Sequence, residues 1–212
     1  MGSTLFNNDK VPVKNLDIID GSEIKDFLKR KLYCNVTDNR LFIITLKFLL
    51  DDISVEKSAD VFIHAAKTIL TTLKGKDWRK SIHAGIFLKE KSKFTSTDFS
   101  GEYIHYHLLV NLHDTTYLDI KNCLEGSVIK HKDFRNLSVD VYGKEDFKDK
   151  HTKMFNPWKN KVTIFEIPYL DYVANYIKKC YQDYTMLISS DSEPNHYVKF
   201  RKITADEFYK DL

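Results

Sequence analysis

The first residues whose types and spacing could support chemistry are His105 and His107, which flank Tyr106. The segment Glu102 to Leu112 (EYIHYHLLVNL) is rich in apolar and aromatic residues, which predicts a strand. Side chains at i and i+2 of a strand share a face, so the two imidazoles would project together from origins roughly 6–7 Å apart. This spacing suits two nitrogen ligands of one divalent ion. Short motifs of this kind often occur by chance, and the motif taken alone favours the solvated face of a strand over a metal site.

The second candidate is a pair of tyrosines, Tyr172 and Tyr176, followed by Lys179. Strong periodicity predicts a helix over Asp171 to Tyr184, and residues three and four apart share a helix face. A phenol with a pKa near 10 is a poor nucleophile, and a nearby ammonium favours the phenolate and can hold a phosphate. The pattern fits a nucleophilic tyrosine, and it also fits an amphipathic helix whose tyrosines pack in the core.

Hydrophobic periodicity predicts the elements that position these residues. Strands are expected over Arg40–Leu49, Ile82–Lys89, Glu102–Leu112, Leu137–Tyr142 and Lys161–Ile167. Helices are expected over Ser22–Leu32, from Ser54 to Gly75, over Tyr117–Leu124 and over Asp171–Tyr184, and a hairpin loop over Lys91–Gly101. This order predicts an α+β fold, in which helices cover a mainly antiparallel central sheet that carries the His-x-His motif. The main domain would span 39–188, after a leader with a short helix (1–38) and before a polar C-terminal appendage (189–212).

The composition is that of an ordinary globular protein. The chain has 212 residues, of which 42% are hydrophobic and 30% charged, and a formal net charge of +3. That charge permits a nucleic-acid partner without arguing for one. We expect no membrane span, because no apolar run is long enough, and no signal peptide, because the start of the chain is polar. The odd cysteine count without metal-ligand spacing indicates reduced thiols in an intracellular protein.

The motifs, taken in order, resemble those of the HUH endonuclease superfamily. A strand (LFIITLKF), a helix, a hairpin ending in HYHLLV and a helix with YVANYIKK follow one another over about Arg40 to Tyr181, as in rolling-circle Rep proteins. The string YVANYIKK is similar to the paired-tyrosine motif of initiators of the phage gene A type. The resemblance implies a nuclease domain over 39–188. It also implies nicking and joining of single-stranded DNA through a 5′-phosphotyrosine intermediate, which initiates rolling-circle replication of a plasmid or virus.

The resemblance also assigns roles on the helix. Tyr176 would be the principal nucleophile, because Lys179 stands three residues beyond it as in the family's motif. Tyr172 would be a second nucleophile that alternates with the first, although Asn175 occupies the position where the family has lysine.

For the metal, the resemblance implies that His105 and His107 bind Mg²⁺ or Mn²⁺ together with an acidic or polar residue on the preceding strand. Glu90 is the preferred third ligand. Glu102 is the rival, although it precedes His105 by three residues and would face the opposite side of a regular strand. Mixed nitrogen and oxygen ligands suit manganese at least as well as magnesium.

The partner implied by the resemblance is single-stranded DNA at a replication origin. Basic residues between Lys144 and Lys161 could bind the strand by charge and by base stacking, and Lys159 and Trp158 are the expected contacts. The same run of residues also fits a solvated surface loop. Because the chain ends about thirty residues beyond the tyrosines, we expect either a separate helicase or a longer protein of which this chain is a fragment. We also expect an intracellular location, in a prokaryotic cytoplasm or in the host cell of a virus.

Other classes of function remain open from the sequence. The same sheet could form a non-catalytic single-stranded nucleic-acid-binding module with an architecture like that of RNA-recognition folds. A related single-strand transposase is a second alternative, although those enzymes are shorter and usually carry glutamine at the place of Lys179. A structural or viral accessory protein without an active site is a third.

Overall fold

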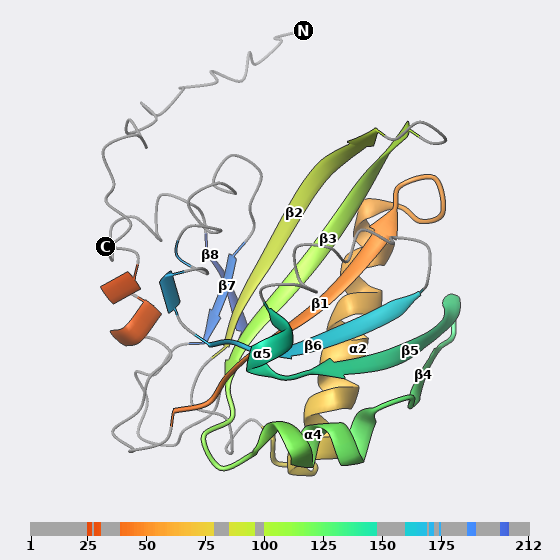
Figure 1. Ribbon diagram of the computed structural model, residues 1–212. Coiled ribbons are helices and arrows are strands. Elements are labelled where there is room, and N and C mark those ends of the chain that lie inside the picture. Colours follow the sequence, from red (N-terminus) through yellow and green to blue (C-terminus); the bar gives the residue numbers. More distant parts are fainter. Residues whose placement is uncertain are drawn as a thin grey trace, which may run out of the picture.

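A single mixed sheet organises the part of the chain that the computed structural model describes (Figure 1). The described residues are 25–26, 28–30, 39–78, 85–95, 100–147, 160–168, 170–171, 174, 186–189 and 200–203. Over 85–95, 100–102, 186–189 and 200–203 the description covers the backbone alone.

The elements follow one another in the order β1 (Leu41–Leu49), α2 (Val55–Lys74), β2 (Gly85–Thr95), β3 (Ser100–Asn111), α4 (Tyr117–Leu124), β4 (Val128–His131), β5 (Phe134–Tyr142), α5 (Lys144–Asp146), β6 (Lys161–Glu166), β7 (Met186–Ser189) and β8 (Phe200–Ile203). The strand order in the sheet is β4-β5-β6-β1-β3-β2-β7-β8. Only the β5–β6 pair is parallel among these neighbours. The prediction of an α+β fold with a mainly antiparallel sheet is therefore confirmed. Within the described residues, no helix is long and apolar enough to cross a membrane.

Helix α2 begins and ends where its residue types predict. The Ser54 side chain accepts a hydrogen bond from the Lys57 backbone N–H at 3.4 Å, which satisfies a donor that the first turn leaves without a partner. Gly75 ends the helix with φ 76°, a left-handed conformation that glycine adopts without steric cost. The expected helix from Ser54 to Gly75 is confirmed.

One face of the sheet packs against α2 and α4, with α2 behind the strands in the view of Figure 1. Alternate residues of the strands point to this face, because successive side chains of a strand lie on opposite sides. The buried cluster includes Phe42, Ile44, Leu46 and Phe48 of β1, Ile104, Tyr106, Leu108 and Val110 of β3, Val162 and Ile164 of β6, and Phe62, Ile69 and Leu70 of α2. These apolar contacts fix which side of β3 faces the helices.

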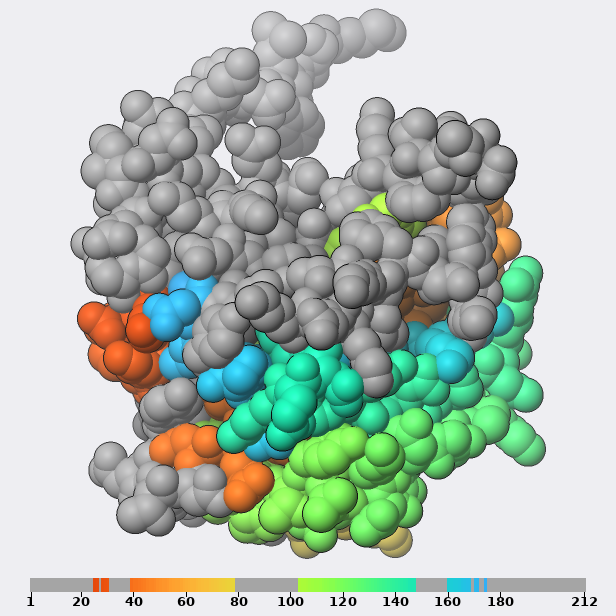
Figure 2. Space-filling view, in the orientation of Figure 1, coloured from red at the N-terminus to blue at the C-terminus, as the bar shows by residue number. Residues whose placement is uncertain are grey.

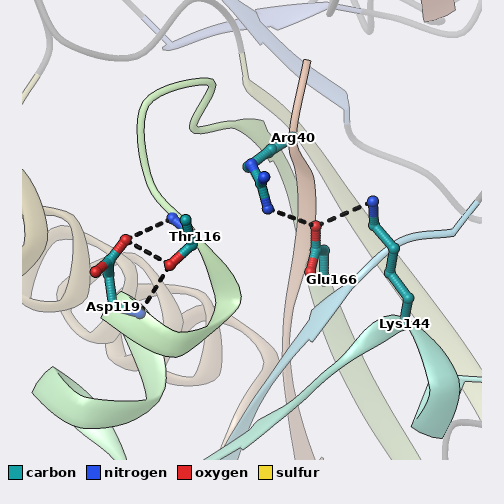
Figure 3. A network of polar contacts seen from close by, with 5 residues as sticks. All are labelled: Arg40, Thr116, Asp119, Lys144 and Glu166. Atoms are coloured by element: carbon teal, nitrogen blue, oxygen red, sulfur yellow. Dashed lines mark hydrogen bonds and ion pairs between the residues drawn. The ribbon is translucent and has the colours of Figure 1, made fainter. Parts of the chain in front are cut away.

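Helix α4 and the ends of the central strands are held by polar contacts that Figure 3 shows. The N-cap residue Thr116 and Asp119 form a capping box, in which the Thr116 backbone N–H donates to Asp119 Oδ2 at 2.8 Å and the Asp119 N–H donates to Thr116 Oγ1 at 3.2 Å. Hydrogen bonds from Thr116 lower the pKa of Asp119. Buried Glu166 Oε1 lies 3.5 Å from Arg40 Nη1 and 3.2 Å from Lys144 Nζ. These ion pairs join the start of β1, the end of β6 and α5.

The expected hairpin between the second and third strands is confirmed, but the loop predicted over Lys91–Gly101 is too long, because β2 continues to Thr95 and β3 begins at Ser100. Within this stretch, Lys93 is the register partner of Glu102. A long antiparallel ribbon satisfies its backbone N–H and C=O groups whatever the polarity of its side chains. The polar composition therefore indicated a loop where cross-strand hydrogen bonding produces two strands.

The region after α4 contains more strand than the sequence analysis predicted. Strand β4 was not predicted, and β5 begins at Phe134 rather than Leu137. β4 has only four residues, and Val128, one of its two apolar residues, is 54% exposed. So short a segment shows no hydrophobic periodicity from which a strand could be predicted. In Figure 2, residues 103–147 (green to teal) form much of the lower part of the visible surface.

Candidate active site

The two histidines lie on the face of β3 that is opposite α2. Tyr106, between them, points to the helix face, where its ring stacks on Phe62 with 5.4 Å between centroids. His105 is 3% and His107 1% exposed. The alternative that the His-x-His motif occupies a solvated strand face is therefore wrong.

The geometry of the imidazoles fits one shared ion. Their ring centroids are 4.9 Å apart and the ring planes cross at 80°. Two imidazoles that bind one ion at nitrogen–metal distances of about 2.1 Å would have centroids roughly 4.5–5.5 Å apart. The pair therefore passes the simplest geometric test for two ligands in a common coordination shell.

Neighbouring side chains hold each ring in place. Thr45 Oγ1, on β1, lies 2.7 Å from His107 Nδ1 in a buried hydrogen bond. The Tyr103 ring stacks on that of His105, with 5.4 Å between centroids and 21° between planes. Contacts that fix ring orientation are a regular feature around metal-binding histidines.

The backbone register distinguishes the two candidates for the third ligand. Glu90 is the register partner of His105 across the β2–β3 ladder, which places it on the histidine face. Directly opposite residues of an antiparallel pair have Cβ atoms about 4.5–5.5 Å apart. Glu102 is three residues before His105 and pairs with Lys93, so it belongs to the opposite face. The register favours Glu90. Among the side chains that the structure describes, which do not include that of Glu90, no group of three acidic, histidine or cysteine residues is arranged to hold a metal.

The sequence analysis did not single out the residues of β1 that border the histidines. Lys47 is the register partner of His105, and Thr45 that of His107. These two are the only polar residues in the β1 segment LFIITLKFL, and their spacing of two places both on one face. Two polar residues spaced by two in an otherwise apolar strand are the sequence pattern that could have identified Thr45 and Lys47 as neighbours of the histidines.

The polar character of this face continues beyond β1 toward β5. Thr163 of β6 is the register partner of Thr45, and Asp140 of β5 is that of Thr163. Asp140 Oδ2 lies 2.5 Å from Lys161 Nζ and accepts a hydrogen bond from the Tyr142 hydroxyl at 3.4 Å. Burial, followed by the neighbouring Asp140 carboxylate, raises the pKa of Tyr142 to about 12. The histidines thus belong to a polar row that crosses several strands.

The expected nucleophile helix is described only at its start. Leu170, Asp171 and Ala174 are helical, as the sequence predicts. Lys25, in the helical residues of the leader, bridges to Asp171, with Nζ–Oδ1 at 2.6 Å and Nζ–Oδ2 at 2.8 Å. Figure 1 shows these two helical pieces beside each other. The other candidates, Tyr172, Tyr176, Lys179, Trp158 and Lys159, lie outside the described residues.

Comparisons with protein-family models, with curated proteins and with solved structures give no match for this chain. The resemblance to HUH endonucleases, and the roles that it implies for the tyrosines, therefore stay predictions.

Proposed function

We propose that the chain is a metal-dependent, tyrosine-using nuclease of the HUH type, which nicks and rejoins single-stranded DNA to initiate rolling-circle replication. The observation that carries the proposal is the buried pair His105 and His107, whose rings lie 4.9 Å apart on one face of the central sheet. The register position of Glu90 adds an acidic residue next to this pair.

Burial of two imidazoles on the same face supports a site rather than a packing accident. A buried polar side chain costs stability unless it is hydrogen-bonded, and an apolar residue at either position would fill the space without that cost. The contacts of Thr45 and Tyr103 orient the rings.

His105, His107 and Glu90 would hold one Mg²⁺ or Mn²⁺, which when bound polarises a phosphate oxygen and offsets charge in the transition state. The Tyr176 phenolate oxygen forms the new bond to phosphorus, and the bond from phosphorus to the 3′ oxygen breaks. The segment downstream of the nick then stays on the tyrosine through its 5′ phosphate, and the 3′ oxygen of the upstream segment takes up a proton to become the hydroxyl that primes synthesis. Lys179 favours the phenolate and contacts the phosphate. Tyr172 would carry a second transfer.

The test is incubation of the full chain with a labelled single-stranded oligonucleotide library and Mn²⁺, followed by denaturing electrophoresis. We expect a protein–DNA adduct that survives denaturation and is absent when a chelator is added. Binding of DNA that persists in chelator without any adduct would instead indicate the non-catalytic nucleic-acid-binding module.

Conservative variants assign the nucleophile. Tyr176→Phe removes one oxygen and keeps the ring, so it should still bind Mn²⁺ and DNA yet form no adduct. Tyr172→Phe should keep the first cleavage and lose a second strand transfer, and Lys179→Ala should slow adduct formation without eliminating it. Peptide mapping that places the DNA on any residue other than Tyr176 or Tyr172 would contradict the proposal.

A further inference from the structure

We infer that Thr45 is a positioning residue for the candidate metal centre, because its hydroxyl accepts the Nδ1 proton of His107 and so directs metal binding to Nε2. The inference rests on the proposed function, and it assigns a role to a residue on a different strand from the histidines. Its basis is the 2.7 Å separation of Thr45 Oγ1 and His107 Nδ1.

The contact is well placed to control the ring. Thr45 is 5% and His107 1% exposed, so water does not compete freely for the hydrogen bond. The two residues are register partners on neighbouring strands, which means that backbone hydrogen bonds of the β1–β3 ladder hold their separation. Thr45 is also β-branched, which restricts its χ1 angle and the position of its hydroxyl.

The chemistry follows from the single proton of a neutral imidazole. When Nδ1 carries the proton and donates it to a hydroxyl oxygen, the lone pair lies on Nε2, which is then the metal ligand. When instead the hydroxyl donates to Nδ1, the proton lies on Nε2 and that nitrogen cannot bind a metal. A hydroxyl can play either part, so the proton position on His107 distinguishes the inferred role from a purely structural hydrogen bond.

The matched variants are Thr45→Val, Thr45→Ser and Thr163→Val. Valine has nearly the shape of threonine and a high strand propensity, so Thr45→Val removes the hydroxyl with little change in packing. Serine restores it. Thr163 is the control, because it is a buried threonine on the same face, directly opposite Thr45 on the strand farther from the histidines.

Two measurements on the full chain test the inference. The first is nitrogen NMR of the metal-free protein with labelled histidine, at a pH where the ring is neutral, which reports which nitrogen of His107 carries the proton. The second is titration with Mn²⁺ alone, followed by electron paramagnetic resonance. We expect the proton on Nδ1 in the unaltered chain and about a tenfold or greater loss of Mn²⁺ affinity in Thr45→Val, the usual size of such outer-sphere effects. Thr45→Ser should recover most of the affinity, and Thr163→Val should keep it.

The outcomes separate this inference from the proposed function. A proton on Nε2 of His107, or unchanged Mn²⁺ affinity in Thr45→Val, would overturn the role of Thr45 and leave the metal site standing. Failure of the unaltered chain to bind Mn²⁺ would overturn the proposed function, and the role of Thr45 with it. The proton position is read on the unaltered chain, so this test does not depend on how well a variant folds.

Discussion

The two faces of the central sheet bury different kinds of side chain. The face beneath α2 and α4 is apolar almost throughout, and the Tyr106 hydroxyl there lies 2.9 Å from the hydroxyl of Ser58. The opposite face also buries apolar residues, among them Ile43 and Leu109. However, it places five buried polar residues beside them, which are Thr45, His105, His107, Asn111 and Thr163.

Because of this difference, neighbouring residues of one strand contribute either to the stability of the fold or to the proposed metal site. Along β3 the chain alternates between the faces, so Tyr106 contributes to the helix-covered core while the histidines on either side of it point to the other face. Apolar burial stabilises the fold, whereas buried imidazoles add little stability for their volume. We therefore expect changes on the helix face to affect unfolding and changes on the histidine face to affect metal binding.

The double variant His105→Ala, His107→Ala tests the histidine face most severely. Because it removes both proposed nitrogen ligands, we expect Mn²⁺ binding and Mn²⁺-dependent cleavage to be abolished while unfolding stays cooperative. Metal titration, the adduct assay and thermal unfolding measure the three properties. Cleavage at the normal rate in this variant would show that the metal assignment is wrong.

Phe62→Ala tests the helix face. Phe62 is fully buried and stacks on Tyr106, so its loss leaves a cavity in the core. We expect the free energy of unfolding to fall by about 3–5 kcal/mol in urea denaturation. Mn²⁺ affinity of the folded fraction should stay unchanged, and a specific loss of affinity would show that the two faces are not separable.

Glu90→Ala and Glu102→Ala compare the two faces at the β2–β3 ribbon. Removal of the only proposed anionic ligand should weaken Mn²⁺ affinity by about tenfold or more in Glu90→Ala. Glu102→Ala is the matched control, because its register places it on the other face. If Glu102→Ala loses affinity and Glu90→Ala does not, the register of this hairpin in solution differs from the one described.

High pH should destabilise the protein through a tyrosine on each face of the sheet. Burial, and then the nearby Glu56 and Asp60 carboxylates, raise the pKa of Tyr106, although the hydrogen bond with Ser58 opposes this shift. On the other face, burial raises the pKa of Tyr142 to about 12. A raised pKa favours the protonated phenol in the folded state. Its stabilising contribution is therefore complete below a pH of about 10 and is lost as the pH rises through the folded-state pKa.

Tyr106→Phe and Tyr142→Phe should each flatten the loss of stability above a pH of about 10, measured as urea midpoints across that range. Tyr106→Phe should also lower the free energy of unfolding by about 1 kcal/mol at neutral pH, because it removes the hydroxyl contact with Ser58. An unchanged alkaline slope in both variants would assign the alkaline loss to other groups.

Residue types and local spacing were sufficient to predict several elements and the pairing of the histidines. The caps Ser54 and Gly75 locate α2, because capping depends on a few adjacent residues. The period of two in a strand places His105 and His107 on one face whatever surrounds them. The interrupted apolar pattern of β1 places Thr45 and Lys47 together for the same reason.

Other properties depend on pairing between segments distant in sequence, and only the tertiary structure decides them. The burial of the histidines could not be predicted from local sequence, because it depends on how distant segments pack. The contact of Thr45 with His107 likewise joins residues 62 positions apart. The extension of β2 through the polar stretch after Lys91 was missed, because cross-strand hydrogen bonds outweigh the loop-like composition. The alternation of a strand already disfavoured Glu102, but the pairing of Glu90 with His105 depends on the register of two strands, which no local pattern specifies.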